Sequence, residues 1–96
     1  MIIQIIKLNS ALTEEELLKV AREREPKFKA ITGLIQKYYV KLDQPGQYGG
    51  VYVWDSKESL QEYKASELAA TIPQAYKLVE SPHIEMLDVL FQLRED

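Results

Sequence analysis

The sequence contains no cysteine and a single histidine among its 96 residues. Without cysteine there is no disulfide framework, thiolate metal site or cysteine nucleophile, and one histidine cannot build a multi-histidine metal site. Positive charge is also scarce, because 12 basic residues face 15 acidic ones and the formal net charge is −3. An extended nucleic-acid interface needs a basic stripe that displaces counterions, so we expect no nucleic-acid partner.

Long hydrophobic runs are missing as well. The apolar run at residues 1–6 is interrupted by Gln4 and is far too short to span a membrane, and no signal-peptide pattern follows it. We therefore expect a cytoplasmic protein with no membrane partner. The length predicts a single domain, 1–96, with a thin core that a second subunit would help to bury.

Hydrophobic patterning and helix-capping residues predict the strands and the helix of the first half of the chain. Residues 2–8 are rich in isoleucine and predict a strand. Thr13 and Glu16 form a capping-box pattern, which predicts the start of a helix whose apolar stripe continues to Ile31. Pro26 is expected to kink this helix or to begin a second one. Residues 34–42 and 50–55 predict two strands joined by a turn at 43–46.

The second half of the chain completes a recognisable order. Ser56 predicts the start of a second helical region, with a short last turn beginning at Pro73, and residues 83–93 predict a final strand. The resulting β-α-β-β-α-β order predicts an α+β, ferredoxin-like fold with a four-stranded antiparallel sheet and its helices on one face. Both parities of the last strand are largely apolar, which predicts that the open sheet face packs against a second copy in a homodimer.

The predicted hairpin carries the most informative side chains. Lys37 and Tyr39 share one parity on its first strand, and Tyr52 and Trp54 share one parity on its second. Aromatic rings with a few polar groups are typical of small-molecule pockets, and a buried lysine can hold an anionic ligand oxygen. The alternative is that aromatic residues are simply favoured in strands and that Lys37 reaches solvent.

Which residues line the pocket depends on the register of the hairpin. If Leu42 lies opposite Gly49, Tyr39 faces Tyr52 and Lys37 faces Trp54, so that all four share one face of the sheet. A slip of one residue would put Tyr38 in their place, because side chains alternate with a period of two.

Two further charged residues are candidates with a strong alternative. Arg22 either points over the sheet and binds an oxyanion or, as we favour, lies on the helix surface paired with Glu23 or Glu25. His83 is the side chain whose ordinary pKa lies nearest neutrality, so it is a candidate general base. The more ordinary interpretation of His83 is a surface residue at a strand edge.

Several of these residues also carry a family resemblance, which extends from about Arg22 to the last strand. They lie in the hairpin and the two helical regions: Arg22, Pro26, Phe28, Gly33, Leu34, Lys37, Tyr39, 49–56, 66–68 and 72–73. On these residues the sequence resembles the small monooxygenase family of the dimeric α/β-barrel superfamily, many of whose members have no established substrate. The resemblance implies a ferredoxin-like protomer, a sheet-to-sheet dimer and a cavity between sheet and helices.

The resemblance also implies a function, from which we infer roles for the candidate residues. It implies a cofactor-independent monooxygenase acting on a small aromatic or polyketide-like compound, and we expect no cofactor. Residues 72–74 stand where the haem-degrading branch of the superfamily has an axial histidine, so haem binding by that route is not expected. The expected catalytic residues are Lys37, Arg22 and His83, and those expected to position the substrate are Tyr39, Tyr52, Trp54 and Tyr63.

Two other functions fit the same pocket. One is a dimer that binds a small molecule without converting it, and the other is an isomerase or cyclase that needs only proton transfer. Oxygen consumption separates the monooxygenase from the isomerase or cyclase, and a ligand that shifts the melting temperature but is never converted favours the binding dimer.

Overall fold

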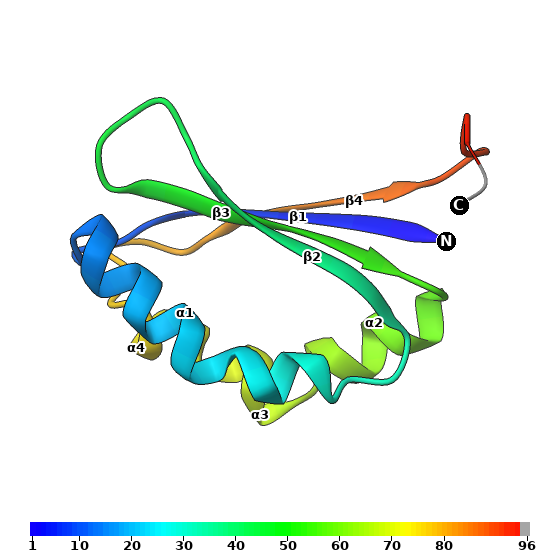
Figure 1. Cartoon of the computed structure of the whole chain (residues 1–96), viewed down its shortest axis with the longest axis horizontal. Coiled ribbons are helices and arrows are strands. Elements are labelled where there is room, and N and C mark those ends of the chain that lie inside the picture. Colours follow the sequence, from blue (N-terminus) through cyan, green and yellow to red (C-terminus); the bar gives the residue numbers. More distant parts are fainter. Residues whose placement is uncertain (95–96) are drawn as a thin grey trace.

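The computed structural model describes residues 1–94 and gives them the expected architecture. Within these residues the chain forms β1 (Ile2–Asn9), α1 (Glu14–Lys29), β2 (Leu34–Lys41), β3 (Gln47–Trp54), α2 (Lys57–Lys64), α3 (Glu67–Ala70), α4 (Ile72–Ala75) and β4 (His83–Asp88). The strands make one antiparallel sheet in the order β2-β3-β1-β4, and the helices cover one of its faces (Figure 1). The predicted ferredoxin-like α+β fold is confirmed.

Helix α1 begins as its sequence predicts. Thr13 accepts a hydrogen bond from the Glu16 amide, and the Glu16 side chain accepts one from the Thr13 amide, which completes the capping box. No second helix begins at Pro26, because α1 runs through it as one helix. Pro26 lies only one turn before the helix ends, so few backbone bonds depend on it. The buried side chains of Ala21 and Phe28 hold the helix against the sheet on both sides of the proline.

The hairpin pairs two residues away from the expected register. Lys37 lies opposite Tyr52 and Tyr39 opposite Gly50, and β3 starts at Gln47 rather than Gly50. A shift of two residues preserves parity, so the predicted set of side chains still shares one face of the sheet. Gly49 lies inside β3. A Cβ at this position would lie 2.4 Å from the Ile6 carbonyl oxygen, so a side chain does not fit there.

The second helical region is divided into three short helices. Ser56 and Ser66 cap α2 and α3 by accepting hydrogen bonds from the Ser59 and Ala69 amides. Pro73 stands in the first turn of α4, as expected from its fixed φ. These helices lie on the same side of the sheet as α1 and cover the part of that face that α1 leaves open (Figure 1).

Strand β4 is shorter than its hydrophobic pattern predicts. It ends at Asp88, which pairs with Ile2 at the beginning of β1. Since β4 runs antiparallel to β1, residues beyond this point have run past the start of their partner strand. One more backbone bond joins the Val89 amide to the Met1 carbonyl, and Leu90, Phe91 and Leu93 that follow are exposed.

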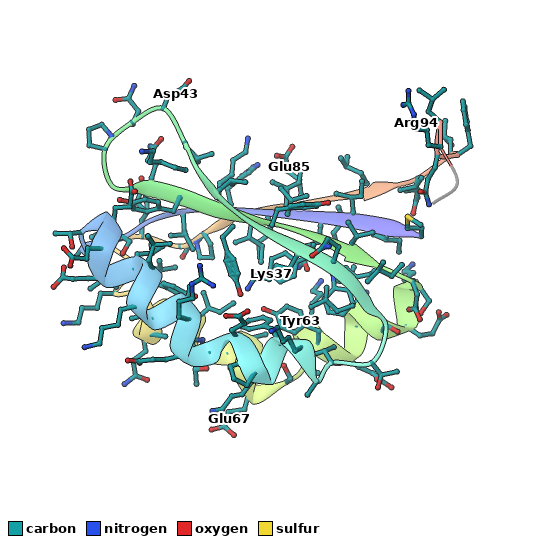
Figure 2. All side chains as sticks on the ribbon, in the orientation of Figure 1. Lys37, Asp43, Tyr63, Glu67, Glu85 and Arg94 are labelled. Atoms are coloured by element: carbon teal, nitrogen blue, oxygen red, sulfur yellow. The ribbon has the colours of Figure 1, made fainter. Side chains whose placement is uncertain are left out.

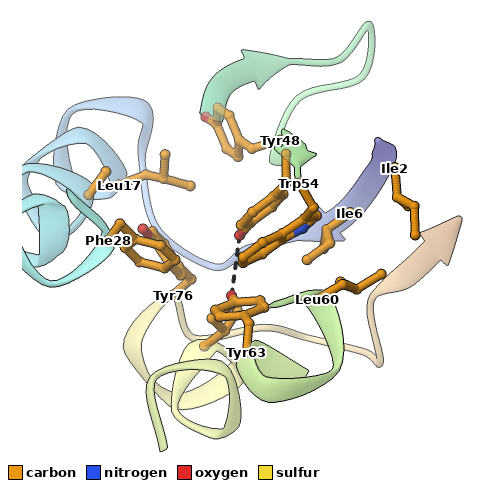
Figure 3. Close-up of a cluster of buried hydrophobic side chains, with 12 residues drawn as sticks. Ile2, Ile6, Leu17, Phe28, Tyr48, Trp54, Leu60, Tyr63 and Tyr76 are labelled. Carbon is orange, nitrogen blue, oxygen red and sulfur yellow. Dashed lines mark hydrogen bonds between the residues drawn. The ribbon is translucent and has the colours of Figure 1, made fainter. Parts of the chain in front are cut away.

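The hydrophobic core lies between the sheet and the helices (Figure 3). Trp54 and Leu60 are its most buried large apolar side chains, and Ile2 and Ile6 of β1 share the same face. No helix within residues 1–94 is long and apolar enough to cross a membrane.

Candidate functional site

Lys37 extends from β2 into the space between the sheet and the helices (Figure 2). Its Nζ lies 3.4 Å from the centroid of the Phe28 ring, 4.3 Å from that of Tyr39 and 4.7 Å from that of Tyr52. Aromatic faces attract a cation at these distances. None of the ion pairs found in residues 1–94 includes Lys37. Three aromatic rings, rather than a carboxylate, therefore surround the amine.

Burial of the Lys37 amine lowers its pKa from 10.5 to about 7, and the nearby charge of Arg24 contributes to the same shift. Desolvation disfavours the charged form of a lysine, as does a like charge nearby. The amine therefore changes its charge close to neutral pH. A group that can both give and accept a proton at neutral pH is suited to acid–base chemistry.

A cavity of about 600 Å³ opens between α1 and β2 next to this amine. Side chains of both elements line it: Leu18, Ala21, Arg22, Glu25, Phe28, Lys29, Leu34, Ile35, Gln36, Lys37 and Tyr39. The volume falls in the range of small-molecule sites. We call this space the Lys37 cavity, and its size leaves room for a ligand.

A narrower space of about 50 Å³ extends inward and shares Ala21, Lys37 and Tyr39 with the Lys37 cavity. Gly50 of β3 lies on its wall. A Cβ at this position would come within 2.9 Å of the Tyr52 ring and 3.6 Å of Lys37 Cε. The absence of a side chain at Gly50 thus makes the room that the Lys37 side chain and the Tyr52 ring occupy.

The two tyrosines beside the amine remain protonated over a wide pH range. Burial raises the pKa of Tyr39 to about 12 and also raises the pKa of Tyr52 well above its usual value. The hydroxyl oxygens of Tyr52 and Tyr63 lie 3.5 Å apart, at the dashed line in Figure 3. Tyr39 lines the Lys37 cavity and Tyr52 its inner extension, so both can act as neutral hydrogen-bond donors there.

Trp54 and Tyr63 are core residues, although the sequence suggested that they position a substrate. Trp54 is 0% exposed, and its Nε1 donates a 3.0 Å hydrogen bond to Oε1 of the buried Gln4. The rings of Trp54 and Tyr63 pack with centroids 5.2 Å apart, and neither residue lines the Lys37 cavity or its extension. The parity prediction was right for Trp54, but α2, which carries Tyr63, covers this end of the sheet and fills it.

The structure brings Arg22 to the mouth of the Lys37 cavity and leaves His83 out of it. Arg22 is 79% exposed, and its Nη1 lies 3.7 Å from Oε2 of Glu25, which is the surface pairing that we favoured. His83 starts β4 and lies 3.7 Å from Glu85 on the sheet face away from the helices (Figure 2 shows Glu85 on that face). A histidine on that face cannot act as a base in the cavity of the same protomer.

Arg24 is a charged residue near the site that sequence reasoning missed. Its Nη2 donates hydrogen bonds to the Leu68 carbonyl oxygen (2.8 Å) and to Thr71 Oγ1 (3.2 Å), and its Cζ lies 6.0 Å from the centroid of the Phe28 ring. Helical spacing could have found it. Leu17, Ala21, Arg24 and Phe28 follow one another at intervals of four, three and four residues, which places Arg24 on the buried stripe of α1.

Comparison with known proteins identifies the fold but no close relative. The chain matches no protein-family model, and no curated protein matches it significantly. A protein of unknown function from Nitrosomonas europaea superposes with a TM-score of 0.79 at 18% identity, with 99% of this chain and 94% of that chain covered.

Two further solved structures carry a functional description. SnoaB, a cofactor-independent oxygenase from Streptomyces nogalater, has a TM-score of 0.77 at 14% identity, with coverage of 98% of this chain and 97% of that chain. A structure described as an antibiotic biosynthesis monooxygenase has a TM-score of 0.71 at 16% identity, covering 94% and 99%. The resemblance seen in the sequence is thus confirmed at the level of the fold: this chain has the fold of solved structures described as a cofactor-independent oxygenase and as an antibiotic biosynthesis monooxygenase.

Proposed function

We propose that this chain is a cofactor-independent monooxygenase that oxidises a small aromatic or polyketide-like compound bound in the Lys37 cavity. The observation that carries the proposal is the Lys37 amine, which titrates near neutrality at the wall of a cavity of about 600 Å³. The fold shared with SnoaB, described as a cofactor-independent oxygenase, supports the same chemistry.

The chemistry follows from the two protonation states of Lys37. The neutral amine accepts a proton from an acidic carbon or phenol of the substrate, and the ammonium group so formed stabilises the resulting anion. The electron-rich anion reduces molecular oxygen. One oxygen atom replaces two hydrogens of the substrate and becomes a carbonyl oxygen, and the other leaves as water, which carries those two hydrogens. Lys37 thus takes the role of base that the sequence assigned to His83, and Tyr39 is placed to donate a hydrogen bond to the anion.

Oxygen uptake by the purified protein tests this proposal, measured with an oxygen electrode on a panel of phenols, quinols and anthrones. We expect uptake with at least one compound, and a loss of about 100-fold or more in kcat/KM on Lys37→Met, since general acid–base catalysis contributes about 10²–10⁴-fold. Lys41→Met is the matched control, because Lys41 lies on the same strand but pairs with Glu14 outside the cavity.

Other outcomes of the same assay would replace the proposal. Conversion of a substrate under nitrogen would mean an isomerase or cyclase. Saturable binding of the compounds with no product from any of them would mean a dimer that only binds its ligand.

We also propose that two copies form a homodimer through the sheet face that the helices leave open. The apolar side chains of this face lie in two rows across the strands: Ile3, Ile5, Tyr38, Val51, Val53 and Leu87. Tyr38 and Leu87 are about half exposed, and Phe91 just beyond β4 is 80% exposed. A contiguous apolar surface of this kind is typical of a protein interface.

Light scattering tests the dimer. Val51→Glu puts a charge at the centre of the face, next to both Tyr38 and Ile5, and should yield monomers, and Phe91→Asp should weaken the same interface. A wild-type protein that is a folded monomer at all concentrations would contradict the proposal.

A further inference from the structure

Two cationic side chains share one aromatic ring inside the protein. Lys37 Nζ and Arg24 Cζ both lie within 6.0 Å of the centroid of the Phe28 ring. Neither side chain takes part in any ion pair found in residues 1–94, and the buried Nε of Arg24 has no hydrogen-bond partner there. A desolvated positive charge without a counter-charge is costly, and an anion beside Lys37 reduces that cost.

The entrance to the Lys37 cavity also carries more positive than negative charge. Arg22 and Lys29 both line it and share a single carboxylate, Glu25, at 3.7 Å and 3.2 Å. Together with Lys37, three basic side chains and one acidic side chain line the cavity, in a chain whose net charge is −3. A cavity whose local charge opposes that of the whole protein raises the local concentration of anions.

Other ionisable groups lie on the elements packed around Lys37. Helix α1 contributes the guanidinium of Arg24 and the carboxylate of Glu25. The remaining groups are hydroxyls with a raised pKa, one from each of β2, β3 and α2 and one just after α4: Tyr39, Tyr52, Tyr63 and Tyr76. The charge at the centre of the site is therefore set by Lys37 near neutral pH.

We propose that the Lys37 cavity selects organic anions, namely aromatic compounds that carry one carboxylate or one ionised phenol, and that Lys37 takes up a proton from solvent when such an anion binds. This inference rests on the proposed use of the cavity as the substrate site, and it adds the charge of the compound that is bound. Toward a compound that binds already ionised, the ammonium group of Lys37 stabilises the anion, and the amine acts as a base only toward a neutral phenol or acidic carbon. The anionic oxygen lies at Lys37 Nζ, and the charge of Arg24, whose Cζ lies 6.0 Å from the centroid of the Phe28 ring, reinforces it.

Proton uptake follows from linkage. An anion at Nζ raises the pKa of Lys37 from about 7. At pH 8.5 the amine of the free protein is largely neutral, so binding takes up close to one proton. At pH 6 the amine is already protonated, so uptake falls toward zero. Affinity for the anion is then level below pH 7 and weakens about tenfold for each pH unit above it.

Calorimetric titration with three pairs of probes tests the inference: benzoate, 2-naphthoate and anthracene-2-carboxylate, each against its uncharged amide. Titrations run at pH 6 and pH 8.5, in two buffers of different ionisation enthalpy, so that proton uptake is counted directly. We expect at least one acid to bind about tenfold or more tightly than its amide at pH 6, with close to one proton taken up at pH 8.5. Lys37→Met should remove both the preference and the uptake, and Lys41→Met, with the same loss of charge on β2, should keep both.

The inference is overturned if every amide binds as tightly as its acid, if neither member of any pair binds, if the preferred acid binds without proton uptake, or if Lys41→Met loses as much as Lys37→Met. The oxygenase proposal fails separately. Acid binding with proton uptake but no oxygen consumption on the full panel leaves the anion site standing and removes the oxygenase. Oxygen consumption without a preference for acids would support the oxygenase and rule out the anion site.

Discussion

The helix-facing side of the sheet carries aromatic side chains at both ends, but one end is packed solid and the other borders a cavity. At the α2 end, Trp54 is fully buried and its one polar hydrogen is bonded to Gln4. At the α1 end, the Lys37 amine has three aromatic rings around it and a cavity of about 600 Å³ beside it, and it forms no ion pair with any residue that the structure describes. Aromatic side chains on one face of a sheet therefore do not mark a site by themselves. Open volume and an unpartnered polar group separate the site from the core.

The helix that packs over each end explains why one end is filled and the other is open. Leu60 and Tyr63 of α2 fill the space beneath Trp54. Lys37 instead comes from β2, the edge strand of the sheet, and α1 leaves a gap beside that edge. The comparison can be tested by variants at either end, since loss of a core residue should cost stability and loss of a site residue should not.

The largest effect is expected at the packed end. Trp54→Ala removes the most buried large side chain and leaves the Gln4 side chain without its donor, so the free energy of unfolding should fall by about 3–5 kcal/mol. Urea denaturation followed by circular dichroism measures it. A variant as stable as the wild type would mean that Trp54 is not core, and the two ends would no longer differ.

A smaller effect of opposite sign is expected at the cavity end. Lys37→Met removes a desolvated charge, so at pH 6 the variant should be more stable than the wild type by about 1–3 kcal/mol. Below pH 7 Lys37 is charged in both the folded and the unfolded protein, and the full cost of burial applies. Between pH 7 and about 10 only the unfolded protein keeps the proton, so the wild type gains stability as pH rises.

The wild type should therefore gain about 1.4 kcal/mol per pH unit on Lys37→Met above pH 7, so that the advantage of the variant disappears before pH 9.5. Urea denaturation of both proteins across this range measures the change. An advantage that is constant with pH would show that the lysine is not desolvated in the folded protein.

The smallest effect is expected at the mouth of the cavity. Arg22→Ala removes an exposed partner of Glu25 at i,i+3, and such surface pairs are worth less than about 0.5 kcal/mol. Thermal denaturation should place the variant within about 2 °C of the wild type. A larger loss would mean that Arg22 packs against the fold in a way that its exposure does not show.

Local sequence patterns correctly predicted where the helices begin and which face of the sheet the hairpin side chains occupy. The capping box at Thr13, the cap at Ser56 and the turn at Pro73 are short-range signals, and the structure confirms each of them. The side of the sheet occupied by Lys37 and Tyr52 also followed from alternation, because parity survives a register error of two residues.

Features that depend on long-range packing were not predicted. The register of the hairpin and the end of β4 are both set by pairing between strands: Tyr39 lies opposite Gly50, and β4 ends where β1 begins. The assignment of Trp54 to the core depends on the position of α2, which no local pattern gives. Arg24 is different, because its helical spacing already placed it on the buried stripe, and only its charge led us to overlook it.

The titration of Lys37 tests the central claim most directly. In protein labelled with ¹³C at lysine, the Cε signal that disappears in Lys37→Met reports this one amine. The account predicts a midpoint of about pH 7 in the ligand-free protein. A midpoint near the ordinary lysine value of about 10.4 would contradict it, because an amine that stays charged there is solvated and cannot serve as a base at neutral pH.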